Sequence, residues 1–133
     1  MKIQYKKPKT SIIIVNYNNA IFLGKCINSV LSQSYRFKEI IVVDDNSTDN
    51  SIKILDKFGD KIIVLKNKKK TTEGSYNQIN CYYKGFLKSK GDYLFFLDSD
   101  DYFKKGKVVS VVKEFKKNKN LKIIFDLPIW KFK

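Results

Sequence analysis

The stretch that decides the fold is residues 93–101, which read YLFFLDSDD, an apolar run that gives way at once to acidic residues. A short apolar run of this kind is typical of a strand that is buried on both faces of a sheet. Residues 11–15 (SIIIV), 40–43 (IIVV) and 62–65 (IIVL) have the same character. We predict a strand at each of these places and a fifth strand at residues 121–125.

The segments between these strands have the spacing of amphipathic helices. Within residues 20–32, apolar side chains recur three, four, seven and eight positions apart, at Leu23, Cys26, Ile27, Val30 and Leu31. Further helices are expected over about 50–58, 75–89 and 107–116. Alternating strands and helices predict an α/β fold, with a mostly parallel sheet of about five strands flanked by helices. A chain of 133 residues, 43% of them hydrophobic, fits one domain over residues 1–133.

Composition excludes several classes of protein. There is no histidine, and the two cysteines form no CxxC pair, which excludes histidine-based catalysis and argues against a zinc cluster. The net charge is +14, yet Arg36 is the only arginine. Specific nucleic-acid sites recruit arginine, so we expect no specific nucleic-acid partner. No apolar run approaches the ~20 residues of a membrane span, so we expect a cytoplasmic protein, at most in peripheral contact with the inner face of the membrane.

Acidic residues gather where the strands end. In parallel sheets, ligands bind at the carboxyl ends of the strands, and Asp98, Asp100 and Asp101 follow one such end directly. Crowded carboxylates repel one another unless a cation lies between them, and oxygen ligands suit Mg²⁺ or Mn²⁺. The alternative is a polar turn that begins the next helix, with Asp101 at its start.

Two other strand ends carry residues that a ligand could contact. Asp44 could accept hydrogen bonds from a ligand's N–H or hydroxyl groups, while Tyr17 could stack on a base or cover the edge of the sheet. The glycine-rich motifs GxxxxGK and GxGxxG are absent, which argues against P-loop and Rossmann dinucleotide sites. A cation and lysines remain as the means to hold phosphate, which points to a nucleoside diphosphate.

Three stretches in this order resemble glycosyltransferase family 2 of the GT-A fold: 11–18 (SIIIVNYN), 41–49 (IVVDDNSTD) and 90–101 (KGDYLFFLDSDD). The resemblance runs from about Thr10 to Phe125. It implies the Rossmann-like, nucleotide-binding half of that fold. It also implies a nucleotide-sugar donor, commonly a UDP-sugar, and inverting transfer of the sugar to a hydroxyl acceptor such as a glycan or lipid-linked glycan.

The resemblance also assigns roles by position. Tyr17 would lie against the base of the nucleotide, and Asp44 would hydrogen-bond to it. Asp98 and Asp100 form the DxD motif of the family and would bind the nucleotide. Asp98, Asp100 and Asp101 would surround Mn²⁺ or Mg²⁺, a Lewis acid toward the departing diphosphate.

The chain departs from the family in two respects. Residues 81–83 read CYY where the family usually has Ala-Arg-Asn, which leaves Gln78 and Asn80 as nearby polar candidates. Family members also continue into an acceptor-binding half that holds the carboxylate base, and no motif here, including that around Asp126, identifies such a base.

Three interpretations therefore stay open. The chain could be a family 2 glycosyltransferase, or a catalytically inactive nucleotide-binding fragment that needs the missing half, another chain or a second copy in a homodimer. A strand followed by Asp-x-Asp also fits a phosphohydrolase of the haloacid dehalogenase type, in which Asp98 would be the nucleophile. Tyr102 argues against this, because that family has threonine or valine shortly after the motif.

Overall fold

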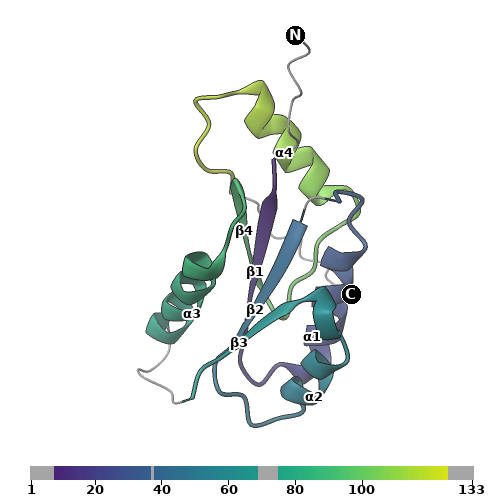
Figure 1. Ribbon diagram of the computed structural model, residues 1–133, viewed down its shortest axis with the longest axis vertical. Helices are drawn as coiled ribbons and strands as arrows, with labels where there is room; N and C mark the ends of the chain where they lie inside the picture. Colours follow the sequence, from purple (N-terminus) through teal and green to yellow (C-terminus); the bar gives the residue numbers. More distant parts are fainter. Residues whose placement is uncertain (1–7, 37, 69–74, 126–133) are drawn as a thin grey trace, which may run out of the picture.

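The computed structural model describes residues 8–36, 38–68 and 75–125. Four strands form one sheet in the order β3-β2-β1-β4, and every neighbouring pair is parallel (Figure 1). The strands are β1 (Thr10–Asn16), β2 (Lys38–Asp44), β3 (Ile63–Lys66) and β4 (Tyr93–Asp98). The predicted parallel α/β sheet is confirmed.

Helices cover both faces of this sheet (Figure 1). They are α1 (Ala20–Leu31), α2 (Ser51–Asp56), the short 3₁₀ helix η1 (Gly59–Lys61), α3 (Ser75–Lys88) and α4 (Lys107–Lys117). The chain moves one way across the sheet from β1 to β3 and then returns past β2 and β1 to β4. Because crossovers between parallel strands are right-handed, α3 lies on the face opposite to α1 and α2.

The core consists of two layers, one on each face of the sheet. In β1 and β2, even-numbered residues such as Ile14 and Val42 pack with α1, α2 and α4, while odd-numbered ones such as Val15 and Val43 pack beneath α3. In β4 the numbering is reversed, and the odd-numbered Leu97 packs in the layer of Ile14. Successive side chains of a strand point to opposite faces, so the middle of each central strand, residues 12–15 and 40–43, must be apolar at every position. This is why their sequences are continuous apolar runs.

The predicted fifth strand is wrong. Residues 121–125 have no regular secondary structure, and Ile123 and Phe125 are 63% and 88% exposed. A strand needs a hydrogen-bonded neighbour, and no described residue pairs with this segment; instead the Leu121 N–H donates to the carbonyl of Asn118 at 3.1 Å. Asp126 lies outside the described residues. In the described part of the chain, no helix has the length and apolar character needed to cross a membrane.

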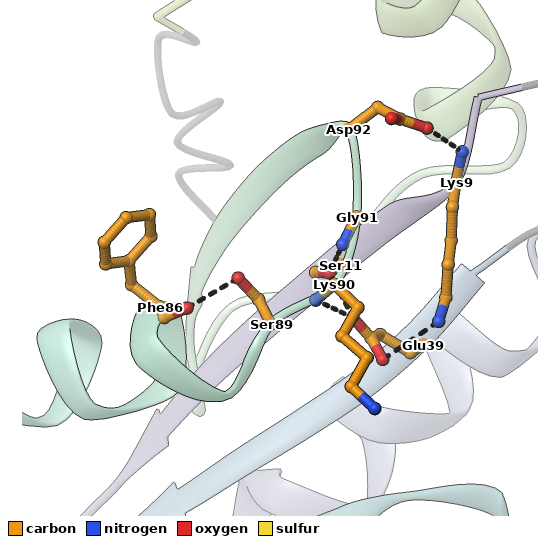
Figure 2. A network of polar contacts seen from close by, with 8 residues as sticks. All are labelled: Lys9, Ser11, Glu39, Phe86, Ser89, Lys90, Gly91 and Asp92. Atoms are coloured by element: carbon orange, nitrogen blue, oxygen red, sulfur yellow. Dashed lines mark hydrogen bonds and ion pairs between the residues drawn. The ribbon is translucent and has the colours of Figure 1, made fainter.

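A polar network holds together the edge of the sheet where the strands begin (Figure 2). The Ser11 hydroxyl donates to Glu39 at 2.5 Å and accepts the Gly91 N–H at 2.8 Å. Glu39 also accepts the Lys90 N–H at 2.6 Å and pairs with the Lys9 ammonium at 3.3 Å. A Cβ atom at Gly91 would lie 2.5 Å from the Ser11 nitrogen, so only glycine fits here. The network fixes the start of β4 relative to β1 and β2.

Candidate functional site

An open cleft of about 370 Å³ lies where β1, β2 and β4 end, against the first turn of α3. This volume lies within the usual range for sites that bind small molecules. The lining residues come from three strand ends and one helix: Val15, Tyr17, Asn19, Asp45, Asn77, Gln78, Asp98, Ser99 and Asp100. The strand ends therefore meet at one site, as the parallel sheet predicts.

The acidic cluster, which we define as Asp98, Asp100 and Asp101, is part of this site. One carboxylate oxygen from each residue lies within 4.8 Å of the others. Burial, followed by the charges of Asp100 and Asp98, raises the pKa of Asp101 above its ordinary value. Oxygen ligands gathered at this spacing fit a hard divalent cation such as Mg²⁺ or Mn²⁺.

Beneath the acidic cluster lies the thiol of Cys26, which donates to the carbonyl of Asp98 at 3.6 Å. Burial and the three carboxylate charges raise the pKa of this thiol to about 12. The thiol therefore stays protonated at neutral pH and adds no further negative charge to the site.

Helix α3 orients Asp98 through two neutral donors. The Gln78 amide donates to Oδ1 of Asp98 at 2.7 Å, and the Tyr82 hydroxyl donates to the same oxygen at 2.5 Å. Burial and then this hydrogen bond raise the pKa of Tyr82, which keeps it protonated as a donor. Tyr82 occupies the place of the arginine expected from the family pattern. Of the two polar candidates, Gln78 lines the cleft, while Asn80 is exposed and does not.

Tyr17 reaches the cleft from a loop after β1 that is hydrogen-bonded to the loop after β2. Asn16 donates to the Asp44 carboxylate at 2.8 Å, and the Asn18 N–H donates to the Ser47 hydroxyl at 2.9 Å. Asn18 has a φ of 49°, in the left-handed region that asparagine tolerates better than most residues. Both neighbours of Tyr17 are thus fixed, and its ring is 44% exposed on the cleft wall.

The two aspartates at the end of β2 have different surroundings. Asp44 is 1% exposed, and its carboxylate accepts hydrogen bonds from Asn16 and from both the N–H and the hydroxyl of Ser47. Asp45 lies on the cleft wall instead. Because side chains alternate along a strand, Asp45 continues the Val43 side of the sheet, which α3 covers. Of the two aspartates, Asp45 therefore lines the cleft, while the hydrogen bonds of Asp44 hold the loops together.

Sequence reasoning missed four polar lining residues, and two of them had a signal. Carrying the strand alternation one residue beyond β2 would have selected Asp45. Asn77 lies four residues before the buried Cys81 on the inner side of α3, where a polar residue interrupts an apolar stripe. Asn19 and Ser99, joined at 3.1 Å, had no signal that we recognise.

The sequence is similar to those of known glycosyltransferases. Residues 11–128 match the family described as glycosyl transferase family 2. An uncharacterised glycosyltransferase of Nostoc sp. is 35% identical over 125 residues, which cover 91% of this chain and 37% of the relative. The Escherichia coli protein WfaP, a UDP-Glc:α-D-GlcNAc-diphosphoundecaprenol β-1,3-glucosyltransferase, is 43% identical over 94 residues, covering 70% of this chain and 36% of WfaP.

Solved structures show the same fold. TarS of S. aureus in complex with UDP-GlcNAc superposes with a TM-score of 0.66 at 25% identity, over 82% of this chain and 31% of TarS. A mannosyltransferase of Pyrobaculum calidifontis, in complex with GDP-Man and Mn²⁺, has a TM-score of 0.72 at 17% identity, over 84% of this chain and 33% of that one. The chain thus spans about a third of the length of these proteins. Each of the three motif stretches contributes residues to the lining of the cleft, and the family match covers residues 11–128. This chain therefore belongs to glycosyltransferase family 2, as the motifs predicted, and has the α/β fold of GT-A enzymes.

Proposed function

We propose that the cleft binds a nucleotide-sugar donor, with a UDP-sugar favoured, together with Mn²⁺ or Mg²⁺, for inverting transfer of the sugar to a hydroxyl acceptor. One observation carries this proposal. Three carboxylates converge within 4.8 Å at the cleft that Tyr17 and Asp45 also line. An aromatic ring, a hydrogen-bond acceptor and a cation site are the groups needed for a base and a diphosphate.

The base would lie at the end of the cleft formed by β1 and β2. The exposed Tyr17 ring offers a stacking surface, and stacking on an aromatic ring tolerates any base. The Asp45 carboxylate accepts hydrogen bonds and donates none, so it favours a base that presents an N–H group. Uracil presents such a group at its ring nitrogen N3, which agrees with the UDP-Glc in the name of WfaP and with the UDP-GlcNAc bound to TarS.

The diphosphate would lie at the acidic cluster. Asp98, Asp100 and Asp101 would hold the cation, which when bound supplies Lewis-acid stabilisation to the departing diphosphate. Gln78 and Tyr82 fix the Asp98 carboxylate before any ligand arrives, so little reorganisation is needed on binding. Since both donors are neutral, they orient Asp98 without competing with a cation for its charge.

The acceptor side rests on the relatives. WfaP is named for a lipid-linked acceptor, and we propose a hydroxyl of a glycan or lipid-linked glycan here as well. Inverting transfer needs a carboxylate base near that hydroxyl. We assign no described residue to this role.

A second candidate function is nucleotide binding without turnover, in a chain that pairs with a second copy of itself. It is favoured by an apolar face over α3 and β4, formed by Ile79, Tyr83, Phe86 and Phe96, whose side chains are 47–62% exposed. Sustained transfer of labelled sugar by the purified chain would exclude this candidate. Sedimentation as a monomer at all concentrations would exclude the pairing.

Titration of the purified chain with UDP by calorimetry tests the main proposal. We expect binding in MnCl₂ that is lost in a chelating buffer. Asp100→Asn should weaken it at least about tenfold, a loss that even outer-shell changes at metal sites cause. Asp60→Asn, an exposed aspartate in η1, is the matched control for charge and should leave binding unchanged. Equal affinity for UDP with metal and with chelator would refute the role of the cation.

A further inference from the structure

We propose that Asn67 and Lys84 are positioning residues that aim the Asp45 carboxylate at the donor base and so select uracil over cytosine. This inference rests on the proposed function, because it needs a nucleotide in the cleft. It concerns two residues that do not line the cleft and that no motif identifies. They act through Asp45, which does line it.

The three side chains form a relay from three different elements. The Asn67 amide NH₂, directly after β3, donates to Oδ1 of Asp45 at 2.8 Å. The amide oxygen of the same residue accepts the Lys84 ammonium of α3 at 2.6 Å. That ammonium also donates to the carbonyl of Lys66, the last residue of β3, at 3.0 Å. Lys84 is thereby held to the strand end that carries Asn67.

The relay fixes the orientation of the Asn67 amide, which would otherwise be free to flip. An ammonium can only donate and an ionised carboxylate can only accept. With Lys84 on one side and Asp45 on the other, a single amide orientation satisfies both partners. The flipped amide would set NH₂ against ammonium and oxygen against carboxylate. The bond to Oδ1 of Asp45 is therefore kept, and the carboxylate cannot rotate freely.

The surroundings of Asp45 make this control effective. Asp45 is 5% exposed, and the thiol of Cys81 hydrogen-bonds to it and lies 3.4 Å from the Asn67 amide nitrogen. Burial and then the charge of Asp45 raise the pKa of Cys81 to about 11, so this thiol is protonated at neutral pH. The carboxylate thus sits among donors supplied by β3 and α3. Its orientation toward the cleft is set before a ligand binds.

The chemistry of the bases converts this orientation into selectivity. Uracil has an N–H at ring position N3 and can donate to a fixed carboxylate. Cytosine has a lone pair at the same nitrogen, which a fixed carboxylate would face with repulsion. A carboxylate free to rotate could turn away from cytosine, so the discrimination depends on the relay as well as on Asp45. A hydrogen bond to a charged group corresponds to a preference of about ten- to a hundredfold.

The test compares UDP with CDP, each titrated calorimetrically in MnCl₂ against the full chain. We expect wild type to prefer UDP by at least about tenfold. Asn67→Leu and Lys84→Met should each bring the ratio of the two affinities toward one. Lys88→Met, an exposed lysine one turn further along α3, is the control and should keep the wild-type ratio. Unfolded protein in a variant sample lowers the measured stoichiometry but does not change the ratio of the two affinities.

The double variant gives a second test. Because Lys84 acts through Asn67, Asn67→Leu combined with Lys84→Met should show the same ratio as Asn67→Leu alone. If either single variant weakens UDP and CDP equally, its role is structural and the inference is overturned. A wild-type ratio near one overturns it as well, while UDP binding itself still supports the proposed function. If wild type binds no nucleotide, the proposed function fails and the inference fails with it.

Discussion

The acidic cluster predicts an unusual effect of a single substitution. We expect Asp101→Asn to stabilise the chain in a chelating buffer and to lose that advantage in MnCl₂. The pKa of Asp101 is raised by burial and by Asp100 and Asp98. A raised pKa in the folded state means that stability is lost as the pH rises from the unfolded value through the folded one. At neutral pH the folded chain therefore bears the full cost of this carboxylate, and asparagine removes it.

The magnitude follows from the spacing of the carboxylates. The carboxylate oxygens lie within 4.8 Å of one another, and at that limit two unit charges repel by about 1 kcal/mol in a water-like dielectric. Asp101 faces two such partners and is largely exposed, so the gain is about 1–2 kcal/mol at low salt and less at high salt. For a chain of this size, that corresponds to a rise in melting temperature of roughly 3–6 °C.

Mn²⁺ should reverse the comparison. At a free concentration of one hundred times its dissociation constant, a bound ion stabilises wild type by about 2.7 kcal/mol. A variant that binds the ion about a hundredfold more weakly gains only about 0.4 kcal/mol under the same conditions. The ion thus offsets the advantage of the variant.

The assay is thermal unfolding of wild type, Asp101→Asn and the control Asp60→Asn, each in chelator and in MnCl₂ at low ionic strength. The control corrects for the added positive charge on a chain that already carries +14. An Asp101→Asn variant that melts below the control in chelator would refute the repulsion. An undiminished Mn²⁺ shift in the variant would refute a cation at this cluster.

Three further predictions test other parts of the structure. Gly91→Ala should lower the free energy of unfolding in urea by about 2–3 kcal/mol, because its Cβ would meet the Ser11 backbone. Gly24 lies inside α1, and a Cβ atom there would be 3.9 Å from its nearest neighbour, so Gly24→Ala should stabilise the chain by about 0.5–1 kcal/mol. Equal effects of the two substitutions would contradict the close approach at Gly91. Burial would raise the pKa of Glu39, but hydrogen bonds from Ser11 and Lys90 lower it overall. The stabilisation by Glu39 is therefore present above its unfolded pKa and is lost as the pH falls through its folded pKa. Glu39→Gln should reduce the loss of stability at acid pH and should cost about 1–2 kcal/mol of stability at pH 7. Tyr17→Ala should weaken UDP binding by about 1–2 kcal/mol yet leave the Mn²⁺ melting shift unchanged, and a smaller shift would show that Tyr17 acts on the acidic cluster instead.

The sheet was predictable because burial on both faces leaves a clear pattern in the sequence. Each of the four observed strands is an apolar run, and β1 and β2 are buried almost throughout. Residues 121–125 carry a similar pattern without forming a strand, since a strand also needs a partner that the pattern itself does not reveal. Apolar runs therefore predict which segments can be strands, while pairing decides which of them are.

The acidic cluster was predictable for a different reason. Its three residues lie within four positions, so one strand end brings them together whatever the rest of the chain does. The Asn67–Lys84 relay spans 17 positions and joins the end of β3 to α3. Such a contact depends on how a helix lies over the sheet, which neither composition nor spacing encodes. Local clusters of functional residues can be found from sequence, whereas the residues that orient them require the packed structure.

The choice between Asp44 and Asp45 lies between these two cases. Both aspartates follow the same strand, and their chemistry is identical, so only the direction of the side chain separates them. Strand alternation places Asp44 with Val42 on the α1 and α2 face and Asp45 with Val43 on the α3 face. Right-handed crossovers determine that α3 takes the face opposite to α1 and α2 once the strand order is known. The cleft lies on the α3 side, so the topology of the sheet determines which aspartate lines it. A difference of one position along the strand separates the aspartate that holds the loops together from the one that lines the cleft.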